Sequence, residues 1–194
     1  MAHIGILCPA TLGHLNPMVN LGNELQRRGH RVTLFSLPDV EAKIAKTGLG
    51  YCQIGAREFP RGRLSDLNTQ ISKLSGLKAI RFSVSIAQMA TEMMFREAPE
   101  AISQAGVDFL LVDQYTFSGG TIADHLHLPF VTICCGLPLF QEAGVPPGFT
   151  LWPYQKSWWA RLRNQLGYQI INLLTRPLWQ QVLKQRERWG LPTY

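Results

Sequence analysis

The order of elements near the amino terminus constrains the fold of this chain most. A short apolar run, Ile4–Cys8, leads into a loop rich in turn-forming residues. Asn16 and Pro17 have the side chains typical of a helix start, and Gly29 is placed to end that helix. Arg31–Phe35 is a second strand-like run. A strand, a helix and a second strand in this order form a right-handed parallel crossover, so we expect a parallel α/β sheet.

The same alternation of strands and helices continues along the chain. We expect a single α/β domain over residues 1–194, with a doubly wound, parallel, Rossmann-like sheet and helices on both faces. A chain of 194 residues with 46% hydrophobic content is large enough to bury such a core. The expected elements are a short helix at 40–46, a strand at 48–54, a loop at 56–68, a helix at about 77–104, a strand at 107–112, a helix at 118–127, a strand at 130–134, a loop at 136–153, and two helices at 157–174 and 177–189.

Several protein classes are disfavoured by the composition. The longest apolar runs are only a few residues, whereas a membrane span needs about 20. The first residues lack the basic region of a secretory signal, so we expect a cytoplasmic protein. The four cysteines form neither CxxC spacing nor a clustered metal-binding pattern, which predicts reduced, structural thiols: Cys8, Cys52, Cys134 and Cys135.

The charge is unevenly distributed. Residues 1–155 hold 12 basic and 12 acidic side chains, whereas residues 156–194 hold seven basic side chains against Glu187. This confined excess, without a recognisable reading motif, argues against nucleic-acid binding. Apolar residues at 158, 162, 166, 170 and 174 lie beside Lys156, Arg161 and Arg163. The pattern predicts contact with a membrane surface through 156–176, unless the apolar stripe packs on the domain.

Two polar residues follow predicted strands. His14 comes after the first strand and Asp113 after the apolar run Phe109–Val112. Because the carboxyl ends of parallel strands share one edge, we expect the two side chains to meet there. A carboxylate beside an imidazole fixes the tautomer of the ring and makes its other nitrogen a better base. Alternatively, His14 bonds a backbone carbonyl in a loop and Asp113 caps the next helix or turn.

The loop after the first strand also bears on nucleotide binding. A dinucleotide-binding loop has the pattern GxGxxG, but only Gly13 lies inside this loop and Gly5 precedes it within the strand. This departure disfavours the alternative of a Rossmann-type oxidoreductase, whose glycines let the backbone approach a pyrophosphate.

At this point the sequence resembles a known family, the nucleotide-sugar-dependent UDP-glycosyltransferases with the GT-B fold, and within it the macrolide and zeaxanthin glycosyltransferase branch. The resemblance spans nearly the whole chain, and the combination of Gly-His-x-x-Pro with Arg-Gly-His-x-Val-Thr is fairly specific. It is carried by six segments: IGILCP at 4–9, GHLNP at 13–17, RGHRVT at 28–33, LVDQ at 111–114, ADHLHLPFV at 123–131, and the tail from Arg186 to Pro192.

The resemblance implies a mechanism and a missing part. His14 would be the general base and Asp113 its partner in an inverting transfer from a nucleotide sugar, expected to be a UDP-sugar, without metal, cofactor or covalent intermediate. The family binds its donor mainly in a carboxy-terminal domain with a glycine-rich segment that these 194 residues lack. This chain is therefore expected to be the amino-terminal, acceptor-binding half and to be inactive alone. The alternative is a non-catalytic module that binds a partner chain carrying the donor site.

The resemblance also implies where the acceptor would bind. Acceptor pockets in such domains lie between the long helices and the loops over the strand ends. A Met-rich wall would suit a lipophilic acceptor such as a terpenoid, carotenoid, sterol, lipid or polyketide alcohol. The same apolar spacing is equally typical of a buried core. The candidate acceptor residues are Phe82, Ile86, Met89, Met93, Phe117 and Phe140.

Overall fold

A five-stranded parallel sheet forms the centre of the molecule in the computed structural model, which describes residues 1–148 and 150–193. Its strand order is β3-β2-β1-β4-β5, and every neighbouring pair is parallel, as predicted. The strands are β1 (His3–Leu7), β2 (Arg31–Ser36), β3 (Gly50–Gln53), β4 (Phe109–Asp113) and β5 (Phe130–Ile133). The order reverses beside β1, and such a switch point favours a ligand site outside the carboxyl ends of β1 and β4.

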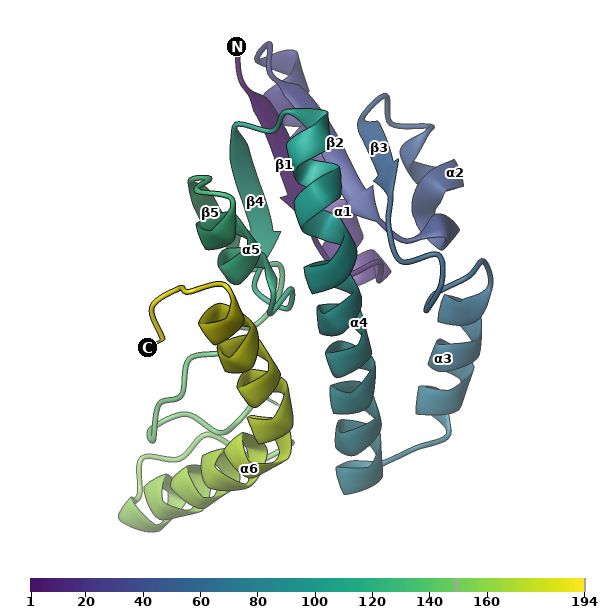
Figure 1. The fold of residues 1–194 in the computed structure, drawn as a ribbon. Coiled ribbons are helices and arrows are strands. Elements are labelled where there is room, and N and C mark those ends of the chain that lie inside the picture. Colours follow the sequence, from purple (N-terminus) through teal and green to yellow (C-terminus); the bar gives the residue numbers. More distant parts are fainter. Residues whose placement is uncertain (149, 194) are drawn as a thin grey trace.

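Helices cover both faces of this sheet (Figure 1). Alternate strand residues point to opposite faces, so Ile4 and Ile6 join one core cluster and Leu7 joins the other. The first cluster includes side chains of α1 (Leu12–Arg27) and α2 (Glu41–Ile44), which follows the short 3-10 turn Pro38–Val40. The second includes side chains of α3 (Arg63–Ser72), α4 (Gly76–Ala105), α5 (Gly119–His125) and the second half of α6 (Trp158–Arg188).

The start of α1 differs from the prediction. The backbone N–H groups of His14 and Leu15 both donate to the carbonyl of Thr11, at 3.1 and 2.9 Å, and close the first turn there. His14 therefore lies on the first turn of α1 instead of in a loop, and Asn16 and Pro17 lie inside the helix. Pro17 lies beyond the first turn of α1, so it removes one backbone hydrogen bond of this helix.

The loop predicted at 56–68 is wrong in its second half, where α3 begins at Arg63. Gly62, in the left-handed conformation at φ 88°, precedes the helix. The carboxylate of Asp39 accepts the backbone N–H groups of Gly62 and Leu64, at 2.6 and 3.1 Å, and satisfies donors that a helix start leaves free. This cap comes from a residue remote in sequence, so local pattern did not reveal the helix.

The two helices predicted at 157–174 and 177–189 are one helix, α6, with Pro177 inside it. Figure 1 shows α6 bent between its two halves. Pro177 explains the bend, because a proline inside a helix removes a backbone hydrogen bond. Beyond the bend, the Arg186 guanidinium is buried and donates to the Asp124 carboxylate at 2.7 Å and to the Pro192 carbonyl at 2.7 Å. These bonds fix the end of α6 against α5.

Two long helices extend past the sheet. Figure 1 shows α4 and α6 continuing beyond the carboxyl ends of the strands, where they form walls beside the sheet edge. In the part of the chain that the structure describes, no helix has an apolar stretch long enough to cross a bilayer.

Candidate active site at the carboxyl edge of the sheet

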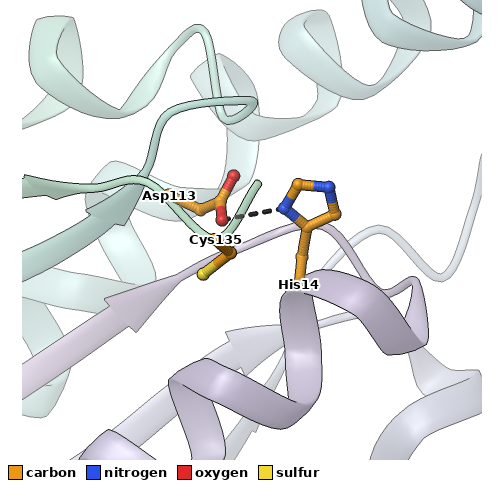
Figure 2. Close-up of side chains that lie close together, drawn as sticks. All are labelled: His14, Asp113 and Cys135. Atoms are coloured by element: carbon orange, nitrogen blue, oxygen red, sulfur yellow. Dashed lines mark hydrogen bonds and ion pairs between the residues drawn. The ribbon is translucent and has the colours of Figure 1, made fainter. Parts of the chain in front are cut away.

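A histidine and a carboxylate meet at the carboxyl edge of the sheet, from the first turn of α1 and the end of β4. The Nδ1 atom of His14 lies 2.9 Å from Oδ2 of Asp113, although the two residues are 99 positions apart. Figure 2 shows the second ring nitrogen of His14 pointing away from the carboxylate. Since a carboxylate only accepts, Nδ1 donates in this pair, and in the neutral form of the ring Nε2 then carries the lone pair.

The carboxylate of Asp113 is held by burial and by a second hydrogen bond. Its side chain is 0% exposed, whereas that of His14 is 21% exposed. Its other oxygen, Oδ1, accepts the backbone N–H of Tyr115 at 2.8 Å. Asp113 therefore holds His14 and also caps the turn after β4. The two expectations for this residue, a partner for His14 and a turn cap, are thus both met by its geometry. Tyr115 adds an edge contact to the imidazole, with ring centroids 5.0 Å apart.

Cys135 is the third polar group at this position (Figure 2). Its Sγ atom and the ligand atoms of His14 and Asp113 lie within 4.8 Å of one another. Burial and the Asp113 carboxylate raise the pKa of the Cys135 thiol to about 12, so at neutral pH it remains a protonated thiol. Burial also raises the pKa of Cys8, which lies in the same region. A metal ion here would have to displace the protons on Cys135 and on Nδ1 of His14.

An apolar cavity of about 320 Å³ adjoins His14. It lies between the sheet edge, the turn after β4 and the inner face of α4. The α4 residues on this wall follow helical spacing at 86, 87, 90, 93 and 94, which places them on one face. Polar groups are few and include the hydroxyls of Ser83, Thr91 and Tyr115. An apolar cavity with a few polar groups is typical of a small-molecule site.

The predicted acceptor residues are divided between different surfaces. Ile86, Met93 and Phe117 line the cavity beside His14. Phe117 and Phe140 line a second groove, between the loop at 137–148 and α6. Met89 faces a third groove, between α4 and the second half of α6. Phe82 packs against the core cluster of α4 and lines none of these three hollows.

Sequence reasoning missed Tyr115 and Cys135 as neighbours of the pair. Tyr115 lies two residues after Asp113, so its place in the turn after β4 could have been inferred from the sequence. Cys135 follows β5, which pairs with β4 and brings the thiol to the same edge. Its apolar sequence context gave no sign of this contact.

The parallel sheet and the cavity over its strand ends define the class of this protein, a doubly wound α/β domain with a cavity at the switch point, where such folds bind ligands. Residues 5–102 match the model of the glycosyltransferase family 28 N-terminal domain, and the chain belongs to that family. The resemblance inferred from the sequence motifs is thereby confirmed.

Individual relatives agree with this assignment. The chain is 30% identical over 191 residues to a zeaxanthin glucosyltransferase of Pantoea ananas, covering 98% of the chain and 44% of that protein. It is 26% identical over 197 residues to a zeaxanthin glucosyltransferase of Pseudescherichia vulneris, covering 99% of the chain and 45% of that protein.

The solved structure of the glycotransferase of kitacinnamycin has the same fold. It superimposes with a TM-score of 0.64 at 18% identity, over 100% of this chain and 42% of that one. The chain thus has the fold of the amino-terminal half of a GT-B glycosyltransferase, and it spans less than half the length of the curated relatives it matches.

Proposed function

We propose that this chain is the acceptor-binding half of a glycosyltransferase in which His14 is the general base. The observation that carries the proposal is the orientation of one ring. Nδ1 of His14 is bonded to the buried Asp113 at 2.9 Å, and the residue lines an apolar cavity. The other nitrogen is thereby left as the acceptor for a proton from a bound alcohol.

The reaction follows from this arrangement. Nε2 of His14 takes the proton of an acceptor hydroxyl while the hydroxyl oxygen attacks the anomeric carbon of a nucleotide sugar. The new C–O bond forms as the bond to the nucleoside diphosphate breaks, so the anomeric configuration inverts. Asp113 stabilises the imidazolium that results. General-base catalysis of this kind contributes about 10²–10⁴-fold, and orientation in the cavity supplies more.

The walls of the cavity suit a lipophilic acceptor. Met93 and Met94 are flexible apolar side chains that adapt to irregular ligands, and Ile86, Ala87 and Ala90 leave room between them. Two matched relatives are zeaxanthin glucosyltransferases, which supports a carotenoid or a similar apolar alcohol as the acceptor class.

The donor is proposed to bind outside this chain. The matched relatives are more than twice as long, and we infer that a carboxy-terminal domain holds the nucleotide sugar, a UDP-sugar by analogy with the family. Alone, this chain should bind acceptor but transfer little sugar. We further propose that the protein works in the cytoplasm.

The test separates binding from chemistry. Zeaxanthin is titrated into this chain and followed by quenching of tryptophan fluorescence, and transfer from UDP-glucose is measured after a donor-binding domain has been supplied. His14→Gln is expected to leave acceptor affinity within about threefold and to reduce kcat by about 10²–10⁴-fold.

The matched control is His127→Asn, at an exposed turn residue with φ 55°, a conformation that asparagine tolerates. It should leave both quantities unchanged. Full activity of His14→Gln would overturn the proposed base. Transfer that needs a separately encoded partner chain would favour the non-catalytic module.

A further inference from the structure

The first half of α6 presents an apolar face to solvent. We call the α6 stripe the five side chains Trp158, Leu162, Leu166, Ile170 and Leu173. Trp158 is 77% exposed, Leu173 68%, and the other three about half. The opposite face of the helix, with Ala160, Asn164 and Gly167, is buried. The alternative that the stripe packs on this domain is therefore wrong for the four residues from Trp158 to Ile170.

All charged side chains in the segment that carries the stripe are basic. Between residues 143 and 186 the sequence contains no Asp or Glu. Lys156, Arg161 and Arg176 are exposed close to the stripe in sequence. Arg163 lies over the rings of Trp152 and Trp159, 4.9 and 5.4 Å from their centroids. Glu142, in the loop packed on α6, is an exposed acidic side chain, whereas α6 itself has no acidic side chain before Glu187. An apolar stripe flanked by cations complements a surface that is apolar inside and anionic at its boundary.

The loop packed on α6 extends this apolar surface. Gln141 and Asn172 exchange two side-chain hydrogen bonds, and the Asn164 amide donates to the carbonyl of Ala143 at 3.0 Å. These bonds fix the loop at 137–148 to α6, while Leu137 and Phe140 remain 70% and 85% exposed.

A second groove lies between this surface and the cavity beside His14. The groove, of about 450 Å³, lies between the same loop and the side of α6 that carries Ile171 and Trp179. Tyr115 and Phe117 line both this groove and the cavity beside His14. The rings from His14 through Tyr115 and Phe117 to Trp179 follow one another at centroid distances of 5.0, 6.3 and 5.5 Å. The side chains of Tyr115 and Phe117 thus form a common wall of the two hollows, and a row of aromatic rings extends from His14 to α6.

We propose that the α6 stripe docks on an anionic lipid surface, and that a lipophilic acceptor passes from the lipid through this groove to His14. The docking itself follows from the exposed stripe and the charge of its surroundings. The route for the acceptor rests on the proposed function above.

Vesicle flotation with this chain tests the docking. The vesicles contain phosphatidylcholine alone or with about one-third phosphatidylglycerol, at low and high salt. We expect strong binding to the anionic vesicles at low salt and a large loss at high salt. Arg161→Gln with Arg176→Gln should weaken binding about thirtyfold, from two basic groups near the surface. Leu166→Gln with Ile170→Gln should weaken it at least about tenfold.

The charge-matched control is Arg31→Gln with Lys46→Gln, which removes two exposed cations toward the amino ends of the strands, opposite α6. It should bind as the parent chain does. Absence of binding to anionic vesicles, or equal loss in the control and the α6 variants, would overturn the proposal. The proposal would also fail if the α6 stripe joined two copies of the chain. In that case the parent chain would be a dimer, and Leu166→Gln with Ile170→Gln would dissociate the dimer without changing vesicle binding.

A donor-binding half is the remaining candidate for a partner that covers the α6 stripe. If the chain linked to such a half no longer binds vesicles, the stripe belongs to an interface between the halves and the proposal fails. Flotation requires no sugar transfer, so failure of the docking leaves the role of His14 intact, and an inactive base leaves the docking intact.

Discussion

The substitution Asp113→Asn tests the orientation of the proposed base without changing the size of the side chain. Asp113 is 0% exposed, and both of its oxygens are committed: Oδ1 accepts the N–H of Tyr115, and Oδ2 accepts Nδ1–H of His14. An asparagine has only one acceptor oxygen and an NH₂ group that donates. If the oxygen keeps the Tyr115 bond, the NH₂ group faces Nδ1 of His14. That nitrogen must then accept, and the proton moves to Nε2.

The cost of this change can be bounded. A ring protonated at Nε2 cannot take a proton from the acceptor, so the whole general-base contribution of about 10²–10⁴-fold is lost, equivalent to roughly 3–5 kcal/mol in the barrier. The opposite orientation of the amide places two donors, its NH₂ group and the Tyr115 N–H, against each other in a buried site. That arrangement costs about 1–3 kcal/mol of stability, so the flipped tautomer is the favoured outcome.

The assay is nitrogen NMR of the imidazole in this chain, which needs no donor. In the parent chain we expect Nδ1 of His14 to be protonated and Nε2 to be bare, and in Asp113→Asn the reverse. His14→Gln assigns the signal, and the other four histidines serve as internal references. Asp66→Asn, an exposed carboxylate on α3, is the control for loss of charge. The same tautomer in the parent chain and in Asp113→Asn would refute the reasoning, whatever the activity.

Three further predictions concern the frame around the site. Asp124→Ala leaves the buried guanidinium of Arg186 without this carboxylate, so it should lower the free energy of unfolding by about 3 kcal/mol, measured by urea denaturation. Gly119→Ala should cost about 1–3 kcal/mol in the same assay, because a Cβ there would lie 2.3 Å from Val112 Cγ1, whereas Gly13→Ala has open space and should be neutral or stabilising. With iodoacetamide at pH 8, exposed Cys134 should be alkylated first, because burial and the Asp113 carboxylate raise the pKa of Cys135 to about 12 and leave it roughly a thousandfold less thiolate than an ordinary thiol. Mass spectrometry that finds Cys135 labelled as fast as Cys134 would contradict its placement, partly buried beside Asp113.

Much of the fold could be predicted because its rules are local. The apolar runs, the glycine after α1 and the crossover order are all visible within short windows, and they determine a parallel sheet. The same topology brings His14 and Asp113 together, since both follow neighbouring strands of one sheet. The pairing across 99 positions could therefore be inferred from sequence, although the catalytic role of the pair stays a prediction.

What could not be predicted depends on contacts between remote segments. The start of α3 depends on Asp39, whose carboxylate comes from the turn after β2. The difference between Met93, beside His14, and Met89, facing another groove, depends on where α6 returns to α4. Helical spacing identifies apolar faces on α4 but does not tell which one a later helix will cover.

The polar and apolar parts of the candidate site come from different layers of the molecule. The histidine–carboxylate pair is fixed at the edge of the sheet by β4 and the first turn of α1, where Asp113 is fully buried and cannot move without disturbing the strand. Much of the apolar wall beside His14 comes from α4, and the second groove is lined by α6 and the loop at 137–148. Figure 1 shows α4 and α6 projecting beyond the sheet. Side chains on these walls can change in size without altering the hydrogen bond that orients the base. Under the proposed function, a single arrangement of His14 and Asp113 is therefore compatible with many acceptors, and the shape of the helical walls determines which of them fits.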